Sequence, residues 1–236
     1  MALNVFQFHD LMKSWVARSE QSDGRGDRRI DIEFSFKAIF MQVRNLSTGK
    51  QYYSKRRKRF EKDLTARSLT FTCYQRYQFL YRDRTRKWLI EALGKNRQLF
   101  SVDLWAYVIM PEHVHLLVYP QEDGKTVSRY ISKVKEDVGR KAVQWIESNA
   151  SEWIPKITVT EGKRTRRRFW QAGGGYDRNI DNPKAILATL DYVQENPVRR
   201  GLVNKAIDWK WSSARWYAGE NDVPLKMDKS LPVFKE

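Results

Sequence analysis

The amino-acid sequence predicts an α+β domain in which an antiparallel sheet carries helices packed on one face. Three observations predict this class. Residues 69–74 alternate as in a strand, two apolar strands flank a turn within residues 104–119, and apolar residues recur with helical spacing over 127–145. The predicted order is strand, helix, strand, strand, helix, followed by a further strand and helix, and no internal repeat is evident.

The first half of the predicted domain contains three strands and a helix. Residues 69–74 are rich in β-branched and aromatic side chains, as strands are. Asp83 is placed to cap a helix that Gly94 weakens, and its apolar positions are Trp88, Leu89, Ala92 and Leu93. Two apolar strands follow at Leu104–Met110 and His113–Tyr119, with proline marking the turn between them.

The second half is predicted to contain two helices. The first is the clearest amphipathic helix in the chain, and its apolar residues are Val127, Ile131, Val134, Val138, Ala142 and Trp145. A basic connector and a run of three glycines at 173–175 follow it. The second helix is expected to begin with Asn182 as N-cap and Pro183 at its first position, and to stop at Pro197.

The composition favours a polyanionic partner and excludes several classes of protein. The 236 residues include 44 Lys and Arg against 28 Asp and Glu, which gives a net charge of +16. Such an excess favours nucleic acid or an anionic surface as partner. The longest apolar run, at 104–110, is far shorter than the roughly 20 residues of a membrane-spanning helix, so integral membrane proteins are excluded. Nucleic acid is the expected partner, and no membrane partner is expected. No secretory signal is visible, and the single Cys73 is compatible with a reducing cytoplasm.

The sequence divides into three predicted parts. Residues 1–50 are predicted as a poorly ordered or loosely packed N-terminal extension, because residues 19–29 are polar and too poor in apolar side chains to pack. Residues 51–217 are predicted to form the folded domain. Residues 218–236 are predicted as a C-terminal tail.

Two of the three histidines, His113 and His115, lie two residues apart in a predicted strand. Both imidazoles therefore leave one face of the sheet, while Val114, Leu116 and Val118 leave the other. Such a pair can bind a divalent metal ion if a third ligand comes from elsewhere. The alternative is a pair of partly exposed strand histidines that bind no metal.

Tyr192 and Asn196 lie on one side of the last predicted helix, because they are four residues apart. At about 100° per residue, Tyr192 points about 170° away from the apolar stripe of that helix. Tyr192 is thus either an ordinary surface residue or a presented nucleophile. In the second case Asn196 could hold the metal ion or the attacked phosphate.

Two basic segments, at 55–59 and 163–168, resemble a binding site for single-stranded nucleic acid. The second leads into an aromatic pair at 169–170, and arginines beside aromatic rings can hold phosphates while the rings stack on bases. The candidate DNA-binding residues are Arg56, Arg57, Arg59, Arg166, Arg167, Arg168 and Trp170. No Walker-type glycine loop is present, so hydrolysis of a nucleoside triphosphate has no support.

Two motifs together resemble a known family. Residues 110–118, MPEHVHLLV, resemble the histidine-hydrophobic-histidine (HUH) strand of the IS200/IS605-like single-tyrosine transposases. Residues 192–203, YVQENPVRRGLV, resemble the tyrosine helix of the REP-associated branch of that family, and the resemblance runs from about Leu69 to Tyr217.

This resemblance implies a ferredoxin-like or RRM-like sheet, with 51–217 as the catalytic domain. It implies a divalent ion, Mg²⁺ or Mn²⁺, held by His113 and His115, with Asn196 where insertion-sequence relatives have glutamine. It further implies that Tyr192 and Asn196 are catalytic. The enzyme would cut and transfer single-stranded or hairpin DNA of the REP type through a 5′-phosphotyrosyl intermediate, as a nucleoid-associated monomer or homodimer.

Two other functions remain compatible with the residues. A binding module could grip structured single strands without cutting them, since charge and aromatic side chains suffice for that. A metal-dependent nuclease that uses water in place of Tyr192 would keep the ion and form no covalent adduct.

Overall fold

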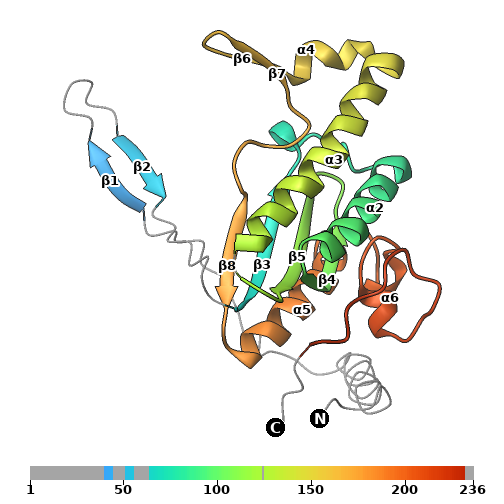
Figure 1. The fold of residues 1–236 in the computed structure, drawn as a ribbon. Helices are drawn as coiled ribbons and strands as arrows, with labels where there is room; N and C mark the ends of the chain where they lie inside the picture. Colours follow the sequence, from blue (N-terminus) through green and yellow to red (C-terminus); the bar gives the residue numbers. More distant parts are fainter. Residues whose placement is uncertain (1–39, 45–50, 56–63, 124, 232–236) are drawn as a thin grey trace. The chain divides into compact units, whose positions relative to one another are not determined.

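A computed structural model describes residues 40–44, 51–55, 64–123 and 125–231 (Figure 1). These residues belong to two compact units. The smaller unit contains an antiparallel hairpin of β1 (Phe40–Arg44) and β2 (Gln51–Lys55). Within the predicted extension at 1–50, only residues 40–44 are described, and they form β1.

The larger unit is built on a four-stranded antiparallel sheet (Figure 1). Its strands are β3 (Ala66–Thr72), β4 (Val102–Ile109), β5 (His113–Pro120) and β8 (Tyr176–Ile180), and their order across the sheet is β4-β5-β3-β8. Helices follow the first and third of these strands along the chain, which gives the β-α-β-β-α-β order of a ferredoxin-like fold. The predicted α+β class with an antiparallel sheet is confirmed.

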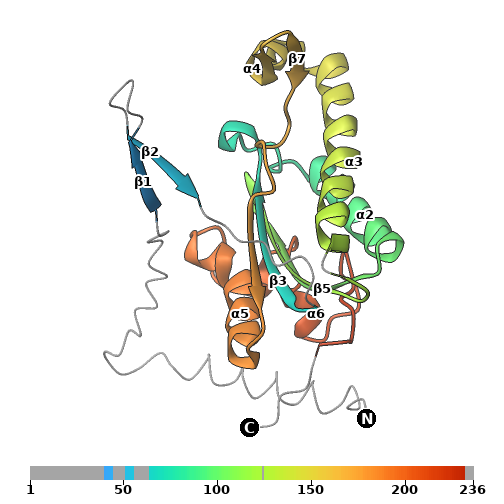
Figure 2. The same cartoon turned by 60° about the vertical axis from the view of Figure 1, so that its left-hand side comes forward.

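Helices cover both faces of the sheet, whereas the sequence analysis placed them on one. Helices α2 (Asp83–Leu99) and α3 (Lys125–Asn149) pack together on one face, and α5 (Pro183–Arg199) lies on the other (Figure 2). The physical reason is that β4 and β5 are buried along nearly their whole length, on both faces. A strand that is apolar at consecutive positions needs a cover on each side.

Two helix boundaries differ from the sequence prediction. Helix α2 has Arg82, not Asp83, at its N-cap and continues through Gly94, where the absence of a side chain lets Leu225 approach closely. Helix α5 begins as predicted, with the Asn182 side chain accepting a hydrogen bond from the Lys184 backbone N–H at 2.8 Å. It continues two residues past Pro197 before it ends.

The remaining elements are short. They are η1 (Tyr74–Arg76), η2 (Ser151–Trp153), α4 (Ile154–Ile157), β6 (Thr158–Glu161), β7 (Arg164–Arg167), η3 (Ala206–Asp208) and α6 (Ala214–Tyr217). The basic connector of the sequence analysis is thus a hairpin of β6 and β7, with Gly162 at positive φ in its turn. The segment after Tyr217, which the sequence analysis separated as a tail, contacts β4: the Asp228 carboxylate accepts a hydrogen bond from the Leu104 backbone N–H at 2.8 Å.

The core of the larger unit lies on both sides of the sheet. Phe71 and Val114 point toward α3, where Phe71 meets Trp170 edge to face. Helix α5 buries Ile186, Leu190 and Val193 against the opposite face. In the part of the chain that the structure describes, no helix is long and apolar enough to cross a membrane.

The glycine run provides a test of how closely the chain passes β3. Gly175 has φ +72°, and a Cβ there would lie 2.0 Å from the Thr70 carbonyl oxygen. Gly173 has φ +87° but nothing within 4 Å of such a Cβ. We expect Gly175→Ala to lower the free energy of unfolding by at least about 2 kcal/mol more than Gly173→Ala, because only the first adds a clash to the backbone strain. Chemical denaturation of both variants measures this, and equal losses would contradict the close approach.

Candidate functional site

Two histidine side chains on β5 meet beneath helix α5. His113 and His115 point to the α5 face of the sheet, as the alternation of the strand predicts, and the Nε2 atoms of the two rings lie 3.0 Å apart. Their rings are nearly perpendicular, and the residues are only 6% and 8% exposed. The pair is therefore buried, unlike the partly exposed histidines of the alternative interpretation.

Each ring also has a neighbour at its Nδ1 atom. His115 Nδ1 lies 2.7 Å from the hydroxyl of Thr70, its cross-strand partner on β3. His113 Nδ1 lies 3.1 Å from Glu112 Oε1, a contact that lacks the alignment of a hydrogen bond. These neighbours fix the rings so that both Nε2 atoms converge.

Helix α5 supplies the other two predicted site residues. Asn196 is buried, and its amide nitrogen lies 3.3 Å from His115 Nε2. The half-buried ring of Tyr192 stands edge to face on the His115 ring, with centroids 5.4 Å apart. The Arg199 guanidinium lies 5.2 Å from the centroid of the Tyr192 ring. The spacing of four residues thus directs both Tyr192 and Asn196 to the histidine pair.

Burial keeps the two imidazoles neutral. It lowers the pKa of His115 to about 3, with a smaller contribution from His113, and it also lowers the pKa of His113 despite the nearby Glu112. Burial acts in the opposite direction on Glu112, but the guanidiniums of Arg200 and Arg76 outweigh it and hold the pKa of that carboxyl below its usual value. The site therefore contains neutral imidazoles beside an ionised carboxylate.

The contacts of His115 are compatible with a metal-binding tautomer. In that tautomer the Nδ1–H donates to Thr70 Oγ1, and the Nε2 lone pair points into the space shared with His113. A neutral imidazole whose other nitrogen is held in this way is a favourable metal ligand.

The residues present fit a divalent metal ion. Two ligands at right angles, each about 2.1 Å from a metal, are about 3.0 Å apart, as the two Nε2 atoms are. The Asn196 amide can present its oxygen after a rotation that exchanges its O and N atoms. Within the described residues, no group of three His, Cys, Asp or Glu side chains could hold a metal, so an ion here would need Asn196 and water or substrate as further ligands.

Comparisons with known proteins agree on one family. A Haemophilus influenzae protein named as a REP-associated tyrosine transposase is 25% identical over 164 residues, which cover 65% of this chain and 84% of that protein. The Escherichia coli K12 REP-associated tyrosine transposase is 27% identical over 120 residues, 50% of this chain and 57% of that protein. A solved structure of a REP-associated tyrosine transposase bound to a REP hairpin has a TM-score of 0.54 at 19% identity, covering 77% of this chain and 95% of that one.

This chain resembles the REP-associated tyrosine transposases. No family model matches it, so the finding depends on these individual relatives. The structural likeness supports the α+β fold with its antiparallel sheet. The resemblance inferred from residues 110–118 and 192–203 is confirmed.

The candidate DNA-binding residues lie in different environments. Arg56, Arg57 and Arg59 lie outside the described residues. Arg166 is exposed on β7, whereas Arg167 and Arg168 form ion pairs with Glu147 and Glu161.

Trp170 is a correction to the sequence analysis, because it is part of the core. Its ring packs edge to face against Phe71, and its indole N–H donates to the Lys135 carbonyl oxygen at 2.9 Å. The residue is only 8% exposed, so little of its ring is accessible to a nucleic-acid base.

Several residues of the site were missed by the sequence analysis. Glu112 directly precedes His113, and its position beside a possible metal ligand was the one available signal. Thr70 becomes visible only when the register of β3 against β5 is known. Arg76 and Arg200 both contact Glu112, at 3.1 Å each, from distant positions in the sequence.

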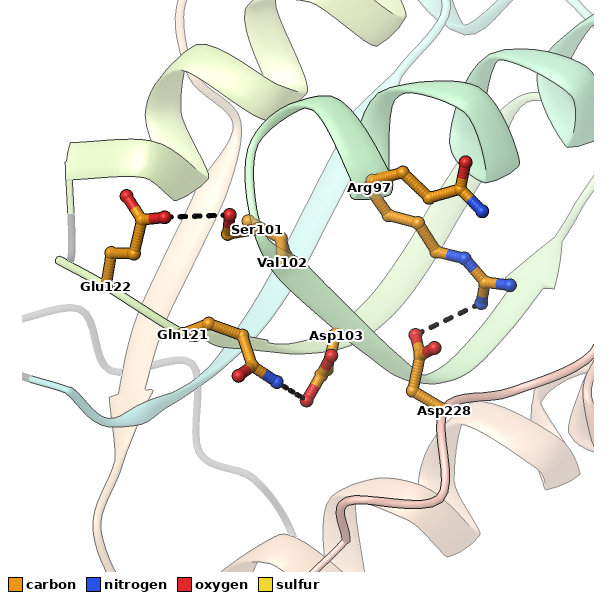
Figure 3. A pocket seen from close by; sticks show the side chains of 8 residues that line it. Arg97, Ser101, Val102, Asp103, Gln121, Glu122 and Asp228 are labelled. Atoms are coloured by element: carbon orange, nitrogen blue, oxygen red, sulfur yellow. Dashed lines mark hydrogen bonds and ion pairs between the residues drawn. The ribbon is translucent and has the colours of Figure 1, made fainter.

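A separate pocket lies where β4 begins and β5 ends, at the opposite end of β5 from His113 (Figure 3). Its lining includes Arg97, Ser101, Asp103, Gln121, Glu122 and Asp228. These side chains pair with one another, as in the contacts of Arg97 with Asp228 and of Ser101 with Glu122. The pocket is therefore not part of the histidine site.

Removal of the Thr70 hydroxyl tests the hydrogen bond between Thr70 and His115. We expect Thr70→Val to lower the free energy of unfolding of the metal-free protein by about 1–2 kcal/mol, because the buried His115 Nδ1 loses its hydrogen-bond partner. Thr70→Ser keeps the hydroxyl and is the matched control. Denaturation in the presence of a chelator measures both, and an unchanged stability of Thr70→Val would contradict a structural role for this hydrogen bond.

Proposed function

We propose that the protein is a metal-dependent single-strand DNA endonuclease and strand transferase that acts on hairpin-containing, REP-like DNA. The observation that carries the proposal is the meeting of Tyr192 with the convergent histidine pair. Tyr192 and His115 come from segments far apart in the sequence, yet their rings are in contact. A buried imidazole pair beside a tyrosine offers both a metal site and a nucleophile.

In this proposal His113, His115 and Asn196 hold a Mg²⁺ or Mn²⁺ ion. The ion would polarise the scissile phosphate and offset the charge that grows on its oxygens. The neutrality of both imidazoles supports this role, since a metal ligand must be deprotonated at the ligating nitrogen.

Tyr192 is the proposed nucleophile. Its phenolic oxygen attacks the phosphorus, the bond from phosphorus to the 3′ oxygen breaks, and the phenolic proton is lost as the 3′ oxygen gains one. The products are a 5′-phosphotyrosyl link and a free 3′-hydroxyl. Attack on the link by the 3′-hydroxyl of another strand reverses the step, so no nucleotide hydrolysis is needed.

The substrate assignment depends on the relatives and on charge. A relative of the same fold is described as bound to a REP hairpin, and the net charge of +16 suits a nucleic-acid ligand. Hairpin β6–β7 presents Arg164 and Arg166, which are exposed and form no ion pair among the described residues. We propose that this hairpin contacts the DNA backbone, and that the protein works at the nucleoid in the cytoplasm.

The assembly is proposed to be a monomer or a homodimer. In this structure Tyr192, His113 and His115 meet within one chain. This supports a centre that one chain completes, whichever assembly forms.

The covalent intermediate provides the test of this function. We expect the protein to form a denaturant-resistant adduct with a labelled, hairpin-flanked oligonucleotide in Mn²⁺. Tyr192→Phe should form none, while Tyr81→Phe, which changes an exposed tyrosine outside the site, should react like the parent. The double variant His113→Ala, His115→Ala should lose cutting and keep DNA binding.

Other outcomes of this experiment identify other functions. Cutting by Tyr192→Phe at the parental rate would show that water is the nucleophile. Tight binding by the parent protein without any cutting would indicate a binding module.

A second prediction concerns hairpin β6–β7. We expect the double variant Arg164→Gln, Arg166→Gln to bind the same DNA more weakly, because two phosphate contacts are lost. The slope of log affinity against log salt concentration should fall by about one for each contact. Arg215→Gln removes an arginine that is paired with Glu220 and is the control. Equal binding by both variants in a salt titration would refute the role of the hairpin.

A further inference from the structure

One oxygen of Glu112 gathers three positive or polar groups from three segments. Glu112 Oε1 lies 3.1 Å from the Arg76 guanidinium, 3.1 Å from the Arg200 guanidinium and 3.1 Å from His113 Nδ1. Arg76 belongs to η1, and Arg200 caps the C-terminal end of α5. Both guanidiniums therefore lie near the His113 ring, because all three groups contact the same carboxylate oxygen.

The carboxylate is the buried member of this cluster, and the arginines face outward. The Glu112 side chain is 6% exposed, whereas the side chains of Arg76 and Arg200 are 63% and 51% exposed. Among the described residues each guanidinium makes this one ion pair, so most of its five N–H groups are available. Two guanidiniums on one carboxylate also leave a net positive charge at this cluster.

The backbone at Arg76 is strained in a way that fixes this arrangement. Gln75 and Arg76 have φ of +49° and +56°, a backbone region that residues other than glycine rarely adopt. The turn is held by hydrogen bonds from the Arg76 N–H to the Cys73 carbonyl at 3.0 Å and from the Cys73 N–H to the Glu112 carbonyl at 2.8 Å. Strained residues of this kind cluster at functional sites. Arg76, one of these two residues, is the one that contacts Glu112.

We propose that Arg76 and Arg200 form a clamp for a backbone phosphodiester of the bound DNA, next to the phosphate that reacts with Tyr192. The proposal extends the proposed function, on which its substrate depends. The two guanidiniums are held at a fixed separation by Glu112, and the planar N–H fork of arginine matches the oxygens of a phosphate. Glu112 is a positioning residue, because it acts through the arginines and through His113.

The clamp has a direct binding test. Binding of a hairpin-flanked oligonucleotide is measured with the Tyr192→Phe protein in a chelator, so that no chemistry takes place. We expect Arg76→Gln and Arg200→Gln each to weaken binding about tenfold, as for one charged hydrogen bond. Arg140→Gln is the matched control, since the Arg140 side chain is 62% exposed and pairs with a single carboxylate, Asp137. Parental affinity in both site variants would overturn the clamp.

Neutral phosphate analogues locate the contact. Oligonucleotides with one methylphosphonate at each successive position are compared on the parent and on the double variant Arg76→Gln, Arg200→Gln. At one position beside the cleavage site, the analogue should weaken binding by the parent and have no effect on the double variant. Equal effects on both proteins at every position would overturn the proposal.

A measurement on the unmodified arginines covers the case in which a variant fails to fold. The Nε–H signals of Arg76 and Arg200, assigned in the free protein by NMR, should shift when the DNA binds, whereas that of Arg140 should not. Unchanged signals for both clamp arginines at saturation would overturn the proposal. If the DNA shifts the clamp signals but the protein never forms the covalent adduct, the proposed transferase function is refuted. If the adduct forms while the signals of Arg76 and Arg200 stay unchanged, only the clamp is refuted.

Discussion

The histidine site depends on burying two polar rings between a strand and a helix. Alternation along β5 sends His113 and His115 to the α5 face, while Val114 and Leu116 go to the core on the other face. Most buried polar groups have hydrogen-bond partners. Thr70 is the partner of His115 Nδ1, and the two Nε2 atoms lie against each other with Asn196 beside them, whereas His113 Nδ1 has only the unaligned contact with Glu112. The packing of α5 on β5 therefore stabilises the fold and assembles the site at once.

The ion pair between Arg200 and Glu112 extends this dependence to the end of α5. The pair ties the last turn of the helix to the residue before His113, and Arg76 ties the turn after β3 to the same carboxylate. Tyr192 lies two turns before Arg200 on the same helix. The ion pair that holds the end of α5 beside His113 therefore also helps to hold Tyr192 beside His115. In the proposed reaction this rigidity would hold the nucleophile in place before the DNA arrives.

Local patterns predicted the parts of the structure that depend on neighbouring residues. The two-residue spacing of the histidines, the four-residue spacing of Tyr192 and Asn196, and the Asn182 cap are all present in the fold. Long-range pairing was not predictable from these patterns. Thr70 and Glu112 acquire their roles through the register of β3 and the path of α5. Trp170 has the sequence context of a stacking residue, but its burial depends on Phe71 and α3. The position of α5 on the second face of the sheet also depends on long-range packing, so it was not predicted.

The central claim is that a metal ion bound by His113 and His115 lies beside the phenol of Tyr192. NMR of the protein labelled on its tyrosine rings tests this most directly, because Mn²⁺ broadens the signals of nearby nuclei. The Tyr192 signal is the one that is missing from the spectrum of Tyr192→Phe. The account predicts that substoichiometric Mn²⁺ removes this signal from the spectrum of the parent protein. The double variant His113→Ala, His115→Ala should abolish the effect. A Tyr192 signal that stays sharp at saturating Mn²⁺ would contradict the account.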